Sequence, residues 1–337
     1  MQQPAPLTPE PIFHTMVAYQ HSAAFAAAVE LNIFTLVAEG NESVAALARA
    51  SGAAERGIRI LCDSLTVMGY LLKKDGAYSL PDISAAFLDR RSPGYMGDAV
   101  YFLNSDKQMH GFAGLTESVR RGGAAEIEGG SLAPDSPMWV KFAKSMMPMM
   151  GPPAQMMADA AGIEKDRPLK ILDIAAGHGI FGVTFLQHYP NARVYAVDWA
   201  NVLTVATENA GKAGVADRHH LIPGSAFDVD YGDDYDIILL TNFLHHFDKE
   251  TNEALLRKIG SALAEGGKVL TLEFVPNEDR VSPPMQALFP LVMLAATPAG
   301  DAYTQAEFTE MLETAGFSKN EFIALAPLPN HLIISER

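Results

Sequence analysis

From residue 168 onward, short apolar runs alternate with amphipathic stretches. Short runs rich in Val, Ile and Leu predict buried strands, whereas apolar residues at every third or fourth position predict helices. The strand-like runs are residues 169–174, 192–197, 220–223, 235–240 and 268–274, and the helix-like stretches between them are residues 180–188, 202–213 and 251–264. Because strands that are joined by helices are covered on both faces, this alternation predicts an α/β fold with a doubly wound, Rossmann-like parallel sheet.

The end of the chain departs from this alternation. Two helix-like stretches, at residues 284–295 and 304–315, are followed by two strand-like runs that only a short proline-containing segment separates. Those runs are residues 321–326 and 331–335. Strands joined by so short a segment pair as a hairpin, so we expect a terminal antiparallel strand on the sheet. An ordinary nicotinamide-binding sheet has six parallel strands, and this ending differs from it.

The first hundred residues show a mainly helical pattern. Apolar spacing predicts helices at residues 22–37, 44–50 and 54–69. Asp75-Gly76 then separates two short strand-like runs and favours a tight hairpin turn, because both residues tolerate a positive φ. Helix, turn, helix and hairpin in this order outline a winged helix.

A winged helix can bind DNA or act as a dimerisation scaffold. Its charges favour the second role, because the ten acidic residues among the first hundred outnumber the seven basic ones. The whole chain has a formal net charge of −15, which also disfavours partners such as nucleic acid or an anionic membrane surface. We therefore expect a homodimer formed through this unit, with no nucleic-acid partner.

Cysteine and histidine usage limits the other site classes. The single cysteine, Cys62, excludes an internal disulfide framework and a thiolate zinc cluster, and the histidines show no metal-ligand spacing, so no metal is expected. No stretch of eighteen residues is apolar and uncharged, and the first residues lack the basic start and apolar run of a signal peptide. These features predict a cytoplasmic protein that does not contact a membrane.

Residues 101–165 read as a connector, helical in patches, between a domain at residues 1–100 and one at residues 166–337. Gly-rich and Pro-rich segments predict breaks at residues 122–123, 129–130 and 151–153. Seven methionines lie between residues 138 and 157. Their flexible, polarizable side chains suit an adaptable apolar substrate pocket and suit plain core filling equally well.

The first strand-like run leads into Gly177, Gly179 and Gly182, which have the G-x-G-x-x-G spacing of a nucleotide-binding loop. Glycines let the backbone approach a ligand, and Asp198, at the end of the next strand-like run, can bind ribose hydroxyls. These features fit a dinucleotide and a nucleoside cofactor equally well. An NAD-dependent oxidoreductase is therefore one hypothesis.

Asp173 favours the nucleoside. It is the last residue but one of the first strand-like run and lies four residues before Gly177. A carboxylate at this place would repel the two phosphates of a dinucleotide, whereas it suits a cofactor with a sulfonium and an ammonium group. The loop therefore indicates S-adenosylmethionine.

The successive motifs of this half resemble those of class I S-adenosylmethionine-dependent methyltransferases. With the N-terminal unit and the connector, the resemblance covers nearly the whole chain and points to small-molecule O-methyltransferases of the caffeic acid, hydroxyindole and bacterial polyketide type. It implies a homodimer, S-adenosylmethionine as methyl donor and S-adenosylhomocysteine as product. The residues that carry it are Asp173, Ala175, Gly177, Gly179, Asp198, residues 224–227 and residues 242–247.

The resemblance also implies roles for individual residues. His245 falls on the family's general base, and Glu273 on the carboxylate that orients it. A histidine suits this task because a phenol, with a pKa near ~10, is mostly protonated at neutral pH. Segments lining the acceptor pocket include Phe142, Met146 and Met293. The cofactor-binding residues implied are Asp173, Gly177, Gly179, Asp198, Trp199, Ser225, Ala226 and Phe227.

Five positions depart from the family pattern, among them Phe247, which stands where tryptophan is usual. Ala175 stands where glycine is usual, and Ser225 replaces the aspartate beside the adenine. Asp301 lies in the stretch that holds the family's second catalytic glutamate, and His246 follows the base where aspartate is usual. Methylation of carbon, nitrogen or sulfur, and a cofactor-binding homologue without catalysis, therefore stay open as alternatives.

Overall fold

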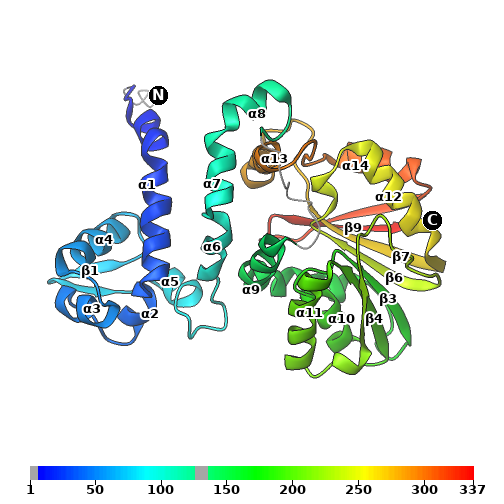
Figure 1. Ribbon diagram of the computed structural model, residues 1–337, viewed down its shortest axis with the longest axis horizontal. Helices are drawn as coiled ribbons and strands as arrows, with labels where there is room; N and C mark the ends of the chain where they lie inside the picture. The colour runs from blue at the N-terminus through cyan, green and yellow to red at the C-terminus, as the bar shows by residue number, and fades with distance from the viewer. Residues whose placement is uncertain (1–6, 126–135) are drawn as a thin grey trace, which may run out of the picture. The chain divides into compact units, whose positions relative to one another are not determined.

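The computed structural model describes residues 7–125 and 136–337 (Figure 1). The chain divides into two compact units, Met1–Ser105 and Asp106–Arg337. The predicted break at residues 129–130 and the residues before position 7 lie outside the described part. Within that part, no helix is long and apolar enough to cross a membrane.

The first unit is built from short helices around one apolar core. Asp75 and Gly76, at φ values of 50° and 83°, form the turn of the predicted hairpin between β1 and β2. Leu47, Ile58, Leu65 and Tyr78 lie in the core, so α3, α4 and the hairpin pack together. The elements are α1 (Glu10–Glu30), α2 (Ile33–Ala38), α3 (Val44–Ser51), α4 (Glu55–Val67), β1 (Leu72–Lys74), β2 (Ala77–Ser79), α5 (Asp82–Phe87), the 3-10 turn η1 (Gly97–Ala99) and α6 (Val100–Leu103).

The first predicted helix, residues 22–37, was wrong in its bounds. The chain forms α1 from Glu10 and then a separate α2, because Asn32 adopts a left-handed conformation with φ at 57°. Asparagine tolerates this conformation better than other non-glycine residues, so the helix direction changes there. The apolar spacing continues across the change and hides it in the sequence.

The second unit contains a seven-stranded sheet with the order β5-β4-β3-β6-β7-β9-β8. The five strands from β5 to β7 are parallel, and β9 is antiparallel to both β7 and β8, as the sequence predicts. The chain reverses its direction of winding between β3 and β6, where ligands bind at the carboxyl ends of such strands. The strands are β3 (Leu169–Ile174), β4 (Ala192–Asp198), β5 (His219–Pro223), β6 (Tyr235–Thr241), β7 (Leu263–Phe274), β8 (Lys319–Ala324) and β9 (Asn330–Glu336).

Helices cover both faces of this sheet, as Figure 1 shows. One apolar core joins the sheet to α9 and α10, and a second joins its other face to α12 and α14. The helices and turns of this unit are α7 (Asp106–Ala113), α8 (Leu115–Arg121), α9 (Pro137–Ala160), α10 (Ile180–His188), α11 (Ala200–Lys212), η2 (Ala216–Arg218), η3 (Leu244–His246), α12 (Lys249–Ser261), α13 (Pro284–Ala296) and α14 (Gln305–Thr314).

The break predicted at residues 151–153 was wrong, because α9 continues through these residues. The helix continues through Pro148, Pro152 and Pro153, although each proline removes a backbone hydrogen bond. The side chains of Ala154, Met157 and other residues beyond the prolines are fully buried in the core against α10. This burial outweighs the local cost, because apolar area removed from water stabilises by about 25 cal/mol per Å².

Candidate active site

A cavity of about 320 Å³ lies at the carboxyl ends of the central strands. It brings together five residues that the sequence predicts at the cofactor, and adds aromatic rings and a threonine from the following turn and α12. The lining residues are Ala175, Val197, Asp198, Trp199, Gly224, Ser225, Ala226, Phe227, Phe243, Phe247 and Thr251.

Asp198 holds the glycine loop against β4. One of its carboxylate oxygens accepts a hydrogen bond from the Gly177 backbone N–H at 2.8 Å, and the other from that of Trp199 at 2.7 Å. Burial raises the pKa of this carboxyl to about 6. Because a carboxylate has about four acceptor positions, two remain for the hydroxyls of a ribose.

The glycine loop itself needs left-handed backbone at several positions. Gly177 and Gly179 have φ values of 57° and 72°, and Ala175 also has a positive φ, 53°. A Cβ on Gly179 would lie 2.7 Å from the Cβ of Ala206 on α11. The loop therefore approaches α11 too closely for any side chain at position 179, while Ala175 keeps the local conformation at some cost.

Asp173 lies behind the loop, fully buried, and does not line the cavity. Its Oδ2 accepts a hydrogen bond from the Gly182 N–H at 3.1 Å, and its Oδ1 has no partner among the described residues. Burial raises the pKa of this carboxyl to about 7. The expectation that this carboxyl faces a positively charged cofactor therefore stays a prediction, because Asp173 is buried and does not line the cavity.

Replacing Asp173 with asparagine should therefore change how stability depends on pH. In the wild type the Asp173 carboxyl binds its proton more tightly in the folded state than in the unfolded chain. The free energy of unfolding therefore falls as the pH rises from about 4 toward 7. Asp173→Asn does not titrate, so its stability relative to wild type should rise by up to about 3 kcal/mol between pH 5 and pH 8. Urea unfolding at the two pH values, without ligand, measures the difference; parallel pH profiles would contradict it.

The opposite wall of the cavity is aromatic and uncharged. Phe227 packs edge-on against Phe247 with ring centroids 4.9 Å apart, and Phe243 packs on Phe247 at 5.0 Å. The Ser225 hydroxyl accepts a hydrogen bond from the Phe227 N–H and so fixes that turn. Among the described residues, no basic side chain lines the cavity. Its lining suits an adenosine with a positively charged tail and offers no side chain to neutralise a diphosphate.

His245 and Glu273 form a buried pair next to this cavity. His245 lies in η3, which begins three residues after the end of β6, and Glu273 lies near the end of the neighbouring strand β7. The Nδ1 atom of His245 is 2.7 Å from Oε2 of Glu273, and the side chains are 7% and 1% exposed. The other oxygen, Oε1, accepts a hydrogen bond from the Phe243 N–H at 3.0 Å. Glu273 therefore fixes the orientation of the imidazole and the backbone of a cavity residue at once.

Apart from Glu273, the described side chains that pack against the His245 ring are uncharged. The Phe289 ring of α13 is perpendicular to the imidazole at 4.8 Å and stacks on Phe274 at 4.2 Å. Burial holds the pKa of His246 well below its ordinary value, and this effect keeps the second histidine uncharged. His246 packs edge-on against Trp139 of α9 at 5.8 Å. These contacts give His245 an apolar, aromatic environment.

The predicted acceptor residues lie on the two helices that supply these rings. On α9, Phe142 packs edge-on against Trp139 at 5.6 Å, and Met146 lies one turn further along. On α13, Met293 is buried and lies one turn after Phe289. Sequence reasoning missed Trp139, Phe274 and Phe289, because each reads as one more apolar residue in a strand or helix.

The partners of the Asp301 carboxylate are residues other than His245 and Glu273. Its carboxylate accepts hydrogen bonds from Arg280 at 3.4 Å and from the Ala302 N–H at 2.8 Å. Its backbone N–H donates to the carbonyl of His245 at 3.0 Å. A Cβ on the preceding residue, Gly300, would lie 2.3 Å from that carbonyl. This segment supports His245 through its backbone.

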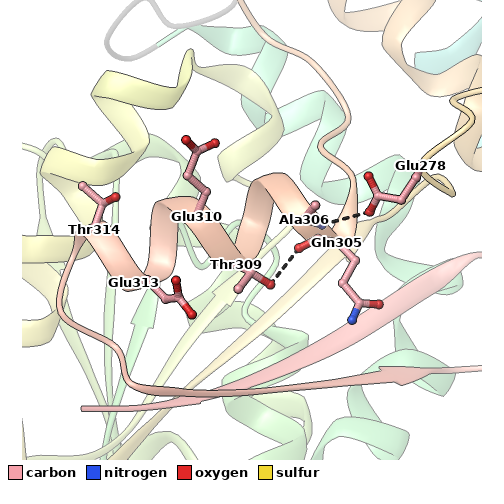
Figure 2. A pocket seen from close by; sticks show the side chains of 7 residues that line it. All are labelled: Glu278, Gln305, Ala306, Thr309, Glu310, Glu313 and Thr314. Carbon is pink, nitrogen blue, oxygen red and sulfur yellow. Dashed lines mark hydrogen bonds between the residues drawn. The ribbon is translucent and has the colours of Figure 1, made fainter.

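A second, more open hollow lies along α14 (Figure 2). Three carboxylates, those of Glu278, Glu310 and Glu313, line it, and Glu278 accepts a hydrogen bond from the Ala306 N–H. Within its described lining there is no histidine, glycine loop or aromatic ring. We therefore assign the chemistry to the cavity beside His245.

Two family models match the chain: an O-methyltransferase domain over residues 157–318 and an O-methyltransferase dimerisation domain over residues 13–90. The chain is 27% identical, over 306 residues, to 3-hydroxy-5-methyl-1-naphthoate 3-O-methyltransferase of Streptomyces sahachiroi, covering 89% of this chain and 87% of that protein. It is also 27% identical, over 312 residues, to L-tyrosine C(3)-methyltransferase of Streptomyces lavendulae, covering 88% and 83%.

Solved structures give a closer match. The crystal structure of a Nostoc punctiforme protein classed among the O-methyltransferases is 50% identical to this chain, with a TM-score of 0.94, covering 99% of this chain and 100% of that one. This identity, the two family models and the cavity beside a buried His–Glu pair agree with one another. The chain belongs to the S-adenosylmethionine-dependent O-methyltransferase family and carries that family's dimerisation domain at its N-terminal end.

Proposed function

We propose that the protein methylates a hydroxyl group of an apolar, aromatic small molecule, with His245 as general base and Glu273 as the carboxylate that orients it. The observation that carries this proposal is the buried contact of 2.7 Å between His245 Nδ1 and Glu273. The family assignment also replaces the NAD-dependent oxidoreductase hypothesis, since no nicotinamide enzyme is needed to explain the glycine loop.

When bound, S-adenosylmethionine supplies a methyl group made electrophilic by a positively charged sulfur, and S-adenosylhomocysteine is left. Glu273 accepts a hydrogen bond from the Nδ1–H group of His245, so the Nε2 atom is left free to accept the proton of the acceptor hydroxyl. The same carboxylate stabilises the imidazolium that forms, as in other histidine–carboxylate pairs. Phe274 and Phe289 exclude water from the imidazole, and this exclusion strengthens the interactions within the site.

The surroundings of His245 support an uncharged, flat acceptor. Rings from α13 and the end of β7 lie against the His245 imidazole, and a ring from α9 packs on the adjacent His246. Flat aromatic molecules pack well against such rings. We expect Phe142, Met146 and Met293 to contact the acceptor, which makes the connector at residues 101–165 part of the pocket. The adaptable methionine side chains would then accommodate acceptors of different outline.

Methylation of a carbon atom is the second candidate function. A relative of similar identity is named as a C-methyltransferase of L-tyrosine, so this family fold accommodates a carbon acceptor. The two functions can be separated with a panel of phenols and their methyl ethers, incubated with isotopically labelled methyl donor. We expect a product that gains one labelled methyl group on oxygen, and no product from the methyl ethers. A label bonded to ring carbon would favour the second function, and a protein that binds donor without forming product would support a non-catalytic homologue.

We also propose that the protein is a homodimer that forms through its first unit and acts in the cytoplasm. The free, buried thiol of Cys62 fits a reducing compartment. Helix α1 presents apolar side chains, Ile12, Phe13, Met16 and Tyr19, that are each at least 60% exposed. Exposed stripes of this kind on soluble proteins mark interaction surfaces.

The double variant Phe13→Asp/Met16→Asp should therefore be a monomer. Two carboxylates on the stripe would have to be buried without a partner in the dimer, at a cost of several kcal/mol. Light scattering with size exclusion at micromolar concentration measures the mass, and Glu10→Asp, which keeps the charge of an exposed neighbour, is the control. A monomeric wild type would contradict the proposal.

A further inference from the structure

Lys258, on α12, binds the turn that forms one wall of the cofactor cavity. Its ammonium group donates to the carbonyls of Ala226 at 3.2 Å, Phe227 at 2.8 Å and Val229 at 2.7 Å. An ammonium group has three donors, so all of them are used here. Two of these three carbonyls belong to residues that line the cavity.

A tyrosine completes the arrangement. The Lys258 ammonium lies 4.3 Å from the centroid of the Tyr231 ring, within the range of a cation–π contact. The Tyr231 hydroxyl donates a further hydrogen bond to the Ala226 carbonyl. The turn therefore has its carbonyl groups directed inward to one cation, while the Phe227 ring faces its aromatic partners Phe243 and Phe247.

Three carbonyl oxygens that converge on one point repel one another unless a donor lies between them. Within the turn, the backbone bonds run from the Asp228 and Val229 N–H groups to the Ser225 carbonyl, and these bonds leave the three carbonyls to Lys258. Without the ammonium, the Phe227 and Val229 carbonyls would lose this donor and the Ala226 carbonyl would keep only the Tyr231 hydroxyl. The turn would then rearrange toward other donors. Such a rearrangement would displace Ala226 and Phe227, which line the cavity.

We propose that Lys258 is a positioning residue for cofactor binding, because it holds the turn at residues 225–229 in the conformation that fits the adenine. The inference rests on the proposed function only for the identity of the cofactor. Burial lowers the pKa of the Lys258 ammonium, in agreement with a cation that has exchanged water for protein carbonyls. Loss of the Lys258 ammonium should weaken the affinity for methyl donor and product and leave the chemical step unchanged. The reason is that His245 is held by Glu273 and by backbone contacts that Lys258 does not make.

The test replaces Lys258 with methionine, which keeps a long apolar side chain and removes the donors. We expect the Kd of S-adenosylhomocysteine, measured by calorimetry, to rise about tenfold or more, since hydrogen bonds to a charged group are worth a factor of this size or larger. The KM for the methyl donor should rise in parallel, while kcat at saturating donor stays within about twofold. Lys258→Arg, which keeps charge and donors, should recover most of the lost affinity.

Lys170 offers a matched control. Its ammonium also donates to a backbone carbonyl, that of Asp233, and lies 4.4 Å from the ring centroid of Tyr235. It lies on β3 at the start of the strand, whereas the cavity is at the carboxyl end. Lys170→Met should therefore leave the Kd of S-adenosylhomocysteine unchanged.

The outcomes separate the inference from the proposed function. A Lys258→Met protein that melts earlier than wild type but binds S-adenosylhomocysteine equally well overturns the inference, because the lysine would then be merely structural. A wild type that does not bind S-adenosylhomocysteine overturns the proposed function and the inference with it. If Lys258→Met does not fold, Tyr231→Phe, which removes the other donor to Ala226, should raise the Kd in the same direction by a smaller factor, and an unchanged Kd would overturn the inference.

Discussion

Replacing His245 with alanine should lower kcat by about 10²–10⁴-fold, the usual contribution of a positioned general base. The acceptor hydroxyl would then have to lose its proton to solvent, and the ring contacts around position 245 restrict access of water. The Kd of S-adenosylhomocysteine should change little, because His245 does not line the cofactor cavity. Initial rates at saturating donor and acceptor, together with calorimetric titration, measure both quantities.

His219 is the matched control for this variant. It is also a buried histidine, and burial lowers its pKa to about 4, but it lies at the start of β5, away from the cavity. His219→Gln should retain kcat near the wild-type value. Glu273→Gln keeps a hydrogen-bond acceptor for His245 and removes the charge, so its kcat should fall between those of wild type and His245→Ala. Full turnover by His245→Ala on the true acceptor would remove the base assignment.

Replacing Asp198 with alanine should raise the Kd of S-adenosylhomocysteine by about 100-fold or more, since two hydrogen bonds to a charged acceptor would be lost. The variant also frees the Gly177 N–H, so the glycine loop loses its contact with β4. Because burial places the pKa of Asp198 at about 6, the carboxyl is ionised above that pH and protonated below it. Wild-type affinity should therefore weaken as the pH falls from 7 to 5, while Asp198→Asn should lack this pH dependence.

Asp236 provides the comparison for Asp198. It too accepts a hydrogen bond from a backbone N–H, that of Lys170 at 2.9 Å, and pairs with Arg167, but it lies near the start of β6. Asp236→Ala should leave the Kd of S-adenosylhomocysteine near the wild-type value. Equal affinity of wild type and Asp198→Ala would show that the ribose contact lies elsewhere.

The candidate site could be predicted from the sequence where its residues end a strand. Asp198 is the last residue of β4, the segment from Asn242 to His246 follows β6, and Glu273 lies near the end of β7. Parallel strands bring their carboxyl ends to one edge, so residues at these positions meet whatever the rest of the chain does. The sequence could therefore predict that the residues at these strand ends lie close together.

Contacts across the fold were beyond this reasoning. Lys258 reads as a surface lysine of an amphipathic helix, and only the packing of α12 brings it to the carbonyls of the turn at residues 225–229. Asp301 reads as a possible second catalytic carboxylate, yet Arg280, twenty-one residues earlier, binds it. In each case the contact depends on the conformation of a loop, and the spacing of apolar residues gives no information about loops.

The sequence by itself determined the alternation of strands and helices, the antiparallel ending and the glycine loop, because short-range spacing decides which faces are buried and where positive φ is needed. The tertiary structure alone decided that α9 continues through three prolines, that Asp173 turns one oxygen to Gly182, and that Phe289 faces His245. These outcomes depend on which side chains remain buried together after packing, and burial is a property of the whole fold that no local pattern encodes.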